Sequence, residues 1–171
     1  MLGSGRPFVL EIKEPKLRKL DLDKIAIEVN EYSKGKTEYH GLKYCQKKRK
    51  AEIKVSSPDT YKIYRALVDC EENTDNLNLD DLNSLKIINQ RTPNRVSHRR
   101  ADLVREKEVK EVRTKIISSN QFEAIIKTQG GLYIKELISG DEGRSKPSFK
   151  EILKTKTFCV ELDVIEVGIK W

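Results

Sequence analysis

Three segments of the chain show the period-two alternation of a β-strand, and this pattern restricts the fold more than any other feature. They are residues 60–70, 121–128 and 158–167. In the last of these, Val160, Leu162 and Val164 are expected to share one face. A strand of this kind packs one face on a core and turns the other toward solvent, as in antiparallel sheets. The pattern therefore predicts a mostly antiparallel sheet with a buried face.

The remaining segments mix helical and strand signals. Asp21 is predicted to cap a helix whose apolar face carries Leu22, Ile25 and Val29, at spacings of three and four residues. Further short helices are predicted near residues 80–88, 132–138 and 148–154, and further strands at residues 8–12, 42–45 and 51–55. For residues 132–138 a strand remains an alternative.

Two long segments are less regular. Residues 103–117 fit either a long edge strand or a helix, because sparse valines interrupt a charged run. Residues 89–101 are basic, lack apolar periodicity and contain Pro93, so we expect an exposed loop. No linker divides the chain, and residues 1–171 are predicted to form one α+β domain. Its mostly antiparallel mixed sheet should carry helices packed on one face.

The chain is strongly basic. Lys and Arg total 34 against 27 for Asp and Glu, which gives a net charge of +7. A basic surface favours a polyanionic partner, because each neutralised phosphate releases condensed counterions. The charge is equally compatible with a solvated surface that binds nothing, so charge alone does not decide the partner.

The cysteines and histidines show no ligand pattern. The three cysteines are widely spaced and the two histidines are isolated, so no metal site is predicted. Unpaired thiols fit a reducing cytoplasm, which is the expected location. No stretch approaches the roughly 18 apolar residues of a membrane span, and no membrane association is expected.

Several ordered segments resemble one known family. Residues 62–66 read K-x-Y-x-A, residues 92–105 read TPNRVSHRRADLVR, and residues 130–137 read GGLYIKEL. A K-x-Y-x-A alone would be weak, but the two long segments have few chance matches. The chain resembles the archaeal and eukaryotic tRNA pseudouridine synthases that modify the T-arm. Shorter matches extend this resemblance to residues 1–8, 139–144 and 159–164.

The resemblance implies a pseudouridine-synthase-like fold and an isomerase of tRNA. In that reaction the C1′–N1 bond of a T-loop uridine, at tRNA position 54 or 55, breaks and a C1′–C5 bond forms. The reaction needs no cofactor and no metal. The target base must leave its stack before a side chain can reach it. The implied partner is the T-arm of tRNA.

The resemblance also implies roles for four residues. Tyr64 would pack on the flipped uracil, and Tyr133 would contact the substrate. Lys135 takes the place of a basic residue that pairs with a catalytic aspartate, where an ammonium lowers the carboxyl pKa. Leu162 would close the floor of the pocket. Without the resemblance each has an ordinary alternative, as a packed aromatic, a solvated lysine or a core leucine.

Six basic residues are candidates for contact with RNA phosphates. Four lie in a dense basic segment and two in a glycine-rich loop near the expected pocket. A solvated charged surface is the alternative for all of them, and more so for the basic run at residues 47–50. The six candidates are Arg95, His98, Arg99, Arg100, Arg144 and Lys146.

The resemblance places the family's catalytic aspartate in a glycine-arginine-acidic-aspartate motif before position 1. We therefore expect an N-terminally truncated, partial catalytic domain that holds the walls of the active site without the nucleophile. An N-terminal piece of the same enzyme would supply that aspartate. Asp102 follows Arg-Arg-Ala and mimics the motif, but the family places its aspartate elsewhere.

Three functions remain open from the sequence. The first is an isomerase, as part of a longer or two-piece synthase. The second is a tRNA-binding module without catalysis, and the third is an assembly domain for ribosomal RNA. Formation of pseudouridine on unmodified tRNA distinguishes the first function from the second.

Overall fold

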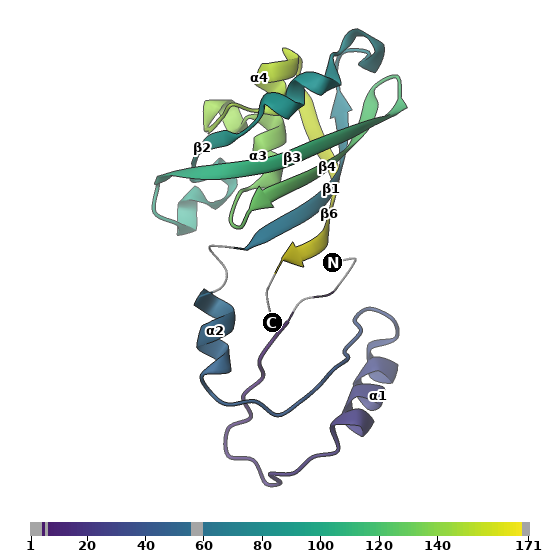
Figure 1. The fold of residues 1–171 in the computed structure, drawn as a ribbon, viewed down its shortest axis with the longest axis vertical. Helices are drawn as coiled ribbons and strands as arrows, with labels where there is room; N and C mark the ends of the chain where they lie inside the picture. Colours follow the sequence, from purple (N-terminus) through teal and green to yellow (C-terminus); the bar gives the residue numbers. More distant parts are fainter. Residues whose placement is uncertain (1–4, 6, 56–59, 169–171) are drawn as a thin grey trace. The chain divides into compact units, whose positions relative to one another are not determined.

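The computed structural model describes residues 5, 7–55 and 60–168 (Figure 1). Contacts divide the chain into two compact units, Pro7–Val55 and a larger unit that comprises the other described residues. The unit boundaries fall at Pro7 and at Val55, and the single domain expected from the sequence stays a prediction. No helix among the described residues is both long and apolar enough to cross a membrane.

The smaller unit contains helices α1 (Leu22–Ser33) and α2 (Arg49–Val55). The predicted cap of α1 is confirmed, because the Asp21 carboxylate accepts a hydrogen bond of 3.0 Å from the Lys24 amide. No described side chain between residues 7 and 53 is fully buried. The apolar face of α1 is correspondingly shallow, with Val29 38% exposed.

The three strands predicted in this unit are wrong. Residues 8–12 and 42–45 form no regular element, and residues 51–55 belong to α2. Phe8, Leu10 and Ile12 are half-exposed or more, as Leu10 at 75% illustrates. Alternation alone does not make a strand, because the backbone groups need a neighbouring strand to pair with. None of the described strands pairs with these residues.

The larger unit is built on a six-stranded sheet with the order β5-β2-β3-β4-β1-β6. Every neighbouring pair is antiparallel, which confirms the predicted arrangement. The central strands alternate strictly between buried and half-exposed residues along most of their length, as the sequence indicated. The strands are β1 (Tyr61–Cys70), β2 (Ile87–Arg91), β3 (Val104–Ser118), β4 (Gln121–Gln129), β5 (Ser145–Lys146) and β6 (Thr157–Gly168).

The long strand β3 lies inside the sheet. Of the two predicted alternatives for residues 103–117 the strand is correct, but it is not an edge strand. Its first five residues pair with β2, and the remainder pairs with β4. The charged composition of this strand follows from its exposure, since only Val109 and Val112 are buried along it.

A β-bulge changes the faces of β6. Leu67 of β1 pairs with Glu161 and Val68 pairs with Cys159, so Val160 has no partner. Val160 is 50% exposed, whereas Leu162 and Val164 pack against the core. The prediction that all three share one face is therefore wrong at Val160, because an extra residue shifts the alternation.

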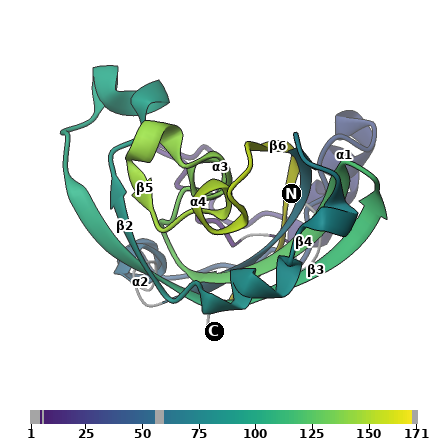
Figure 2. The same cartoon turned by 90° about the horizontal axis from the view of Figure 1, so that it is seen from above.

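Helices α3 (Ile134–Ser139) and α4 (Phe149–Leu153) cover one face of the sheet, inside its curve (Figure 2). Both helices confirm the predictions for residues 132–138 and 148–154. Their apolar residues join those of β1 and β4 in a single core, where Phe122 and Phe149 stack with ring centroids 6.4 Å apart. Gly140 ends α3 in the left-handed conformation, and its amide donates to the Glu136 carbonyl.

Four 3-10 helices complete the larger unit: η1 (Thr74–Asn76), η2 (Leu79–Ser84), η3 (Asn94–Arg99) and η4 (Asp141–Gly143). The helix predicted to end near Ile88 stops earlier, because Ile88 is a fully buried residue of β2. The loop predicted for residues 89–101 likewise contains the end of β2 and all of η3. Pairing with β3 and burial of Val96 order this segment despite its charge.

Replacing Phe122 by alanine tests the core. The side chain is fully buried and stacked on Phe149, so Phe122→Ala should lower the free energy of unfolding by about 3–5 kcal/mol. Ile117→Ala, at a half-exposed position of β3, is the matched control and should change it by less than about 0.5 kcal/mol. Urea unfolding measures both, and equal losses would contradict this core.

Candidate functional site

Tyr64 and Leu162 lie on adjacent strands, on the face that carries the helices. Tyr64 pairs with Val164 of β6, and Leu162 pairs with Ala66 of β1. Tyr64 is only 7% exposed, and burial raises the pKa of its phenol. Its hydroxyl has no hydrogen-bond partner within the described residues. The fold thus brings the two predicted pocket residues together, with Tyr64 packed as deeply as an ordinary core residue.

Tyr61 lies on the opposite face of β1, as its spacing from Tyr64 predicts. Its hydroxyl donates a hydrogen bond to Glu166, and the Lys127 ammonium lies 4.3 Å from its ring centroid. The hydrogen bond to the Glu166 carboxylate raises the pKa of the Tyr61 phenol. Tyr61 is therefore held by surface contacts, and only Tyr64 faces the helices.

Helix α3 places Lys135 on the same side of the sheet as Tyr64. Three buried apolar residues set the helix against that face and leave Lys135 exposed: Ile134, Leu137 and Ile138. Lys135 has no ion-pair partner among the described residues. Burial raises the pKa of the Cys159 thiol on β6. The Lys135 ammonium partly opposes that rise, so the two side chains interact electrostatically. A cleft shared by Lys135 and Tyr64 stays a prediction.

Tyr133 precedes α3 and is fixed from two directions. Its amide donates to the Gln90 side chain at 2.8 Å, and the Gln90 amide group donates to the Tyr133 carbonyl at 3.0 Å. The Arg95 guanidinium lies over its ring, 5.4 Å from the centroid. The backbone and ring of Tyr133 are therefore positioned by β2 and η3 together.

Arg95 is bound to Glu136 of α3. Its Nε donates to the carboxylate at 2.5 Å, and this hydrogen bond raises the pKa of the guanidinium. Glu136 has a side chain only 6% exposed, while that of Arg95 is 54% exposed. The second Glu136 oxygen is buried and has no partner within the described part of the chain. Arg95 thus compensates a buried carboxylate, and contact of Arg95 with RNA stays a prediction.

A second arginine pair fixes the loop that carries η3. Arg91 and Arg144 both bind the Asp102 carboxylate, with shortest N–O distances of 2.6 and 2.7 Å. Arg144 also donates two hydrogen bonds to the Thr92 carbonyl, at 2.9 and 2.7 Å. The hydrogen bond from Arg91 is the main cause that lowers the pKa of Asp102. The Asp102 carboxylate thus binds two guanidinium groups.

These contacts bring together three of the segments that carry the family resemblance, namely residues 92–105, 130–137 and 139–144. The loop at residues 92–103 meets α3 through the Arg95–Glu136 pair. It meets η4 through Asn94, whose amide donates to Asp141 at 3.0 Å. The remaining candidates for phosphate contact, His98, Arg99, Arg100 and Lys146, are exposed, and their contact with RNA stays a prediction.

Sequence reasoning missed three residues of this arrangement. Gln90 is 3% exposed and links β2 to Tyr133 and to the Ser145 hydroxyl. Glu136 and Arg91 were not singled out either. The alternation of Ile88 and Gln90 on β2 was the only available signal, and it does not show that a glutamine would be buried.

Known proteins resemble this chain along most of its length. The family model described as Pus10, C-terminal matches residues 1–168. The chain belongs to the Pus10 C-terminal family. A tRNA pseudouridine synthase Pus10 from Methanosphaera stadtmanae is 50% identical over 99% of the chain and 42% of its own length. The Pus10 from Korarchaeum cryptofilum is 45% identical over 99% of the chain and 46% of its own length. The chain thus spans less than half the length of these Pus10 relatives.

A solved structure supports the fold. One chain in the crystal structure of a Cbf5-Nop10-Gar1 complex superposes with a TM-score of 0.54 and 19% identity. The match covers 71% of this Pus10-family chain and 34% of that chain. The predicted pseudouridine-synthase-like α+β fold is therefore confirmed.

The Arg95–Glu136 pair can be tested by mutation. Arg95→Ala leaves the buried carboxylate without its cation and should lower the free energy of unfolding by about 1–3 kcal/mol. Arg99→Ala, in the same 3-10 helix, should change it by less than about 0.5 kcal/mol. Adding Glu136→Gln to Arg95→Ala should recover part of the loss. Urea unfolding of the four proteins measures this, and equal effects of the two arginine substitutions would refute the pairing.

The lowered pKa of Asp102 predicts a pH dependence. Its charged form is favoured in the folded state, so the stabilisation is present above the unfolded-state pKa. It should be lost as the pH falls through the lowered folded-state pKa. Asp102→Asn should therefore be less stable than the parent protein at pH 7, and the two should converge in acid. Thermal unfolding from pH 7 to pH 2 measures the difference, and a constant gap would argue against the assignment.

Proposed function

We propose that this chain forms one side of the active site of a tRNA pseudouridine synthase that acts on T-loop uridines, at tRNA positions 54 or 55. The supporting observation is that Tyr64, Leu162, Tyr133 and Lys135 all lie on or beside the helix-bearing face of a pseudouridine-synthase-like sheet. The curated relatives that match the chain carry the name tRNA pseudouridine synthase Pus10. The expected location is the cytoplasm.

The reaction is an isomerisation. The C1′–N1 bond of the flipped uridine breaks, a C1′–C5 bond forms, and the hydrogen on C5 is replaced by one on N1. The atoms of substrate and product are the same, so no oxidant, metal or cofactor is required. The target base leaves its stack to reach the site, and a basic surface holds the RNA backbone.

Each predicted residue then has a physical role. Tyr64 offers the exposed part of its ring and a hydroxyl to the flipped base, and Leu162 closes the apolar floor beside it. Tyr133 contacts the substrate from the start of α3, where Arg95 and Gln90 position it. Lys135 supplies an ammonium that favours the charged form of a catalytic aspartate.

The aspartate is proposed to come from residues outside this chain, in an N-terminal piece of the same enzyme. Asp102 is a poor nucleophile, because hydrogen bonds from Arg91 and Arg144 occupy both of its oxygens. The chain by itself should therefore bind tRNA without converting it. In this respect the isolated chain would behave as a non-catalytic tRNA-binding module.

Assays of pseudouridine formation test the proposal. Unmodified tRNA is incubated with this chain and with a longer protein that includes the preceding segment, and pseudouridine is mapped by its carbodiimide adducts. Only the longer protein should form product, in the T-loop. Product formed by the chain alone and abolished by Asp102→Asn would overturn the assignment of the nucleophile. Absence of product from both proteins would leave only the RNA-binding function.

Lys135 provides the sharper test within the longer protein. The side chain is exposed, so its replacement should not disturb the fold. Lys135→Ala should lower kcat by about tenfold or more, because loss of the ammonium raises the pKa of the aspartate. Lys135→Arg should restore most of the rate. It should also return the acidic limb of the pH–rate profile to its position in the parent protein. Lys115→Ala, an exposed lysine of β3, is the control, and an equal loss there would refute the role.

A further inference from the structure

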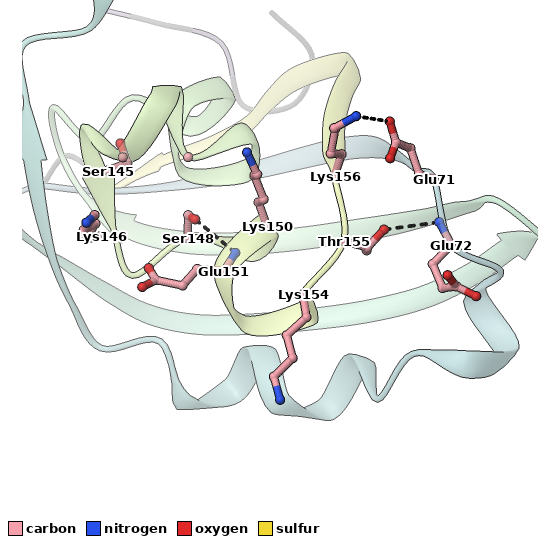
Figure 3. A pocket seen from close by; sticks show the side chains of 12 residues that line it. Glu71, Glu72, Ser145, Lys146, Ser148, Lys150, Glu151, Lys154, Thr155 and Lys156 are labelled. Carbon is pink, nitrogen blue, oxygen red and sulfur yellow. Dashed lines mark hydrogen bonds and ion pairs between the residues drawn. The ribbon is translucent and has the colours of Figure 1, made fainter.

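Two grooves adjoin on the larger unit and share Gly143 and Lys146. The smaller has a volume of about 420 Å³ and lies beside Arg91 and Arg144. The larger, about 850 Å³, runs along α4 and is termed here the α4 groove (Figure 3). Its lining comes from the residues after β1, the loop after α3, β5, and α4 with the residues that follow it. None of the four predicted active-site residues lines either groove.

The arginines near these grooves are engaged by the protein itself. Arg91 and Arg144 bind Asp102, and Arg144 also binds the Thr92 carbonyl. Arg95 binds Glu136. A guanidinium held in this way offers fewer donors to an external phosphate. Free positive charge in this region must therefore come from other side chains.

Three lysines of the α4 groove supply that charge. Lys146, Lys150 and Lys154 are exposed, and none has an ion-pair partner among the described residues. Two glycines line the groove beside them. A Cβ atom at Gly143 would lie 3.3 Å from Lys146, and one at Gly140 would lie 3.0 Å from the Ser148 hydroxyl, so a larger residue at either position would crowd the groove.

The acidic residues of the groove are partly neutralised. Glu71 pairs with Lys156 at 2.8 Å, as Figure 3 shows, and the pair removes one charge of each sign. Glu72 accepts a hydrogen bond of 2.9 Å from the Asn76 side chain. Glu151 is the remaining acid. The lining thus contains three unpaired lysines and two carboxylates that have no ion-pair partner among the described residues, so the groove keeps a net positive charge.

Backbone phosphates suit such a site better than a compact anion does. Lysine ammoniums are point charges on flexible stems, so they attract phosphates without imposing a fixed geometry. They line a groove of about 850 Å³, which is larger than a single phosphate. The groove also continues into the smaller one, where Lys146 is common to both.

We infer that the α4 groove binds the phosphate backbone of tRNA at a distance from the target uridine, through Lys146, Lys150 and Lys154. The inference rests on the proposed function for the identity of the RNA. It extends the predicted phosphate contacts, which included Lys146, to Lys150 and Lys154 of α4 and its C-terminal end. Such contacts position the RNA and carry little sequence information.

Salt-dependent binding tests this surface. The affinity for unmodified tRNA is measured for the double variant Lys150→Ala/Lys154→Ala at several salt concentrations. Affinity should fall about tenfold near 0.1 M salt, and the slope of log Kobs against log salt should decrease by about one to two. The control, Lys110→Ala/Lys115→Ala on β3, removes the same formal charge, although Lys110 already binds Glu108 at 3.0 Å, and should leave both quantities nearly unchanged.

Three outcomes would overturn the inference. They are an equal loss of affinity in both double variants, no detectable binding of tRNA, and displacement of tRNA by polyglutamate as effectively as by RNA of equal charge. The last result would assign the groove to an acidic protein segment. Pseudouridine formation at saturating tRNA is measured separately in the longer protein. If that activity is absent while the two double variants still differ in affinity, the proposed function fails and this surface stands.

Discussion

The packing of α3 and α4 on one face of β1 and β4 is the constraint on which the rest of the structure depends. Alternate residues of both strands are fully buried beneath these helices, and Phe122 stacks on Phe149 at the centre. Because protein interiors are densely packed, a helix seated in this way has little freedom to slide or rotate. The positions of Tyr133 and Lys135 follow from that seating. The core packing of Leu137 and Ile138 therefore fixes the position of the side chains at the start of α3.

Electrostatic pairs then attach the basic loop to this core. Glu136 lies on the buried side of α3, and Arg95 crosses from η3 to bind it. At the other end of the loop, the Asp102 carboxylate binds both Arg91 and Arg144. Loss of Arg95 would leave the Glu136 carboxylate, only 6% exposed, as a poorly solvated charge. The Asp102 carboxylate is 41% exposed and accepts hydrogen bonds from two arginines. Together these contacts give the loop a defined conformation despite its charged composition. Cationic residues of a basic loop can thus stabilise the fold by binding carboxylates of the same chain.

Particular residues show how far the sequence could be interpreted. The strands around Phe122 and Val68 were predictable, because each alternates between a core face and a half-exposed face. The helix cap at Asp21 was predictable for a local reason, since its carboxylate needs only the amide three residues later. The strands predicted at residues 8–12 and 42–45 failed, because strand formation requires a partner that no local pattern reveals. Val160 was misplaced by a single unpaired residue, since a bulge depends on the neighbouring strand.

The sequence by itself determined the family and the α+β class, and it selected the residues that are proposed for one side of the site. These depend on residue order and on local periodicity, both of which can be inferred along a single chain. Only the tertiary structure decided which cations are free. Arg95 and Arg144 bind carboxylates that are distant in sequence, whereas Lys150 and Lys154 have no partner among the described residues. Whether a charge is compensated depends on neighbours brought close by folding, and residue order does not specify them.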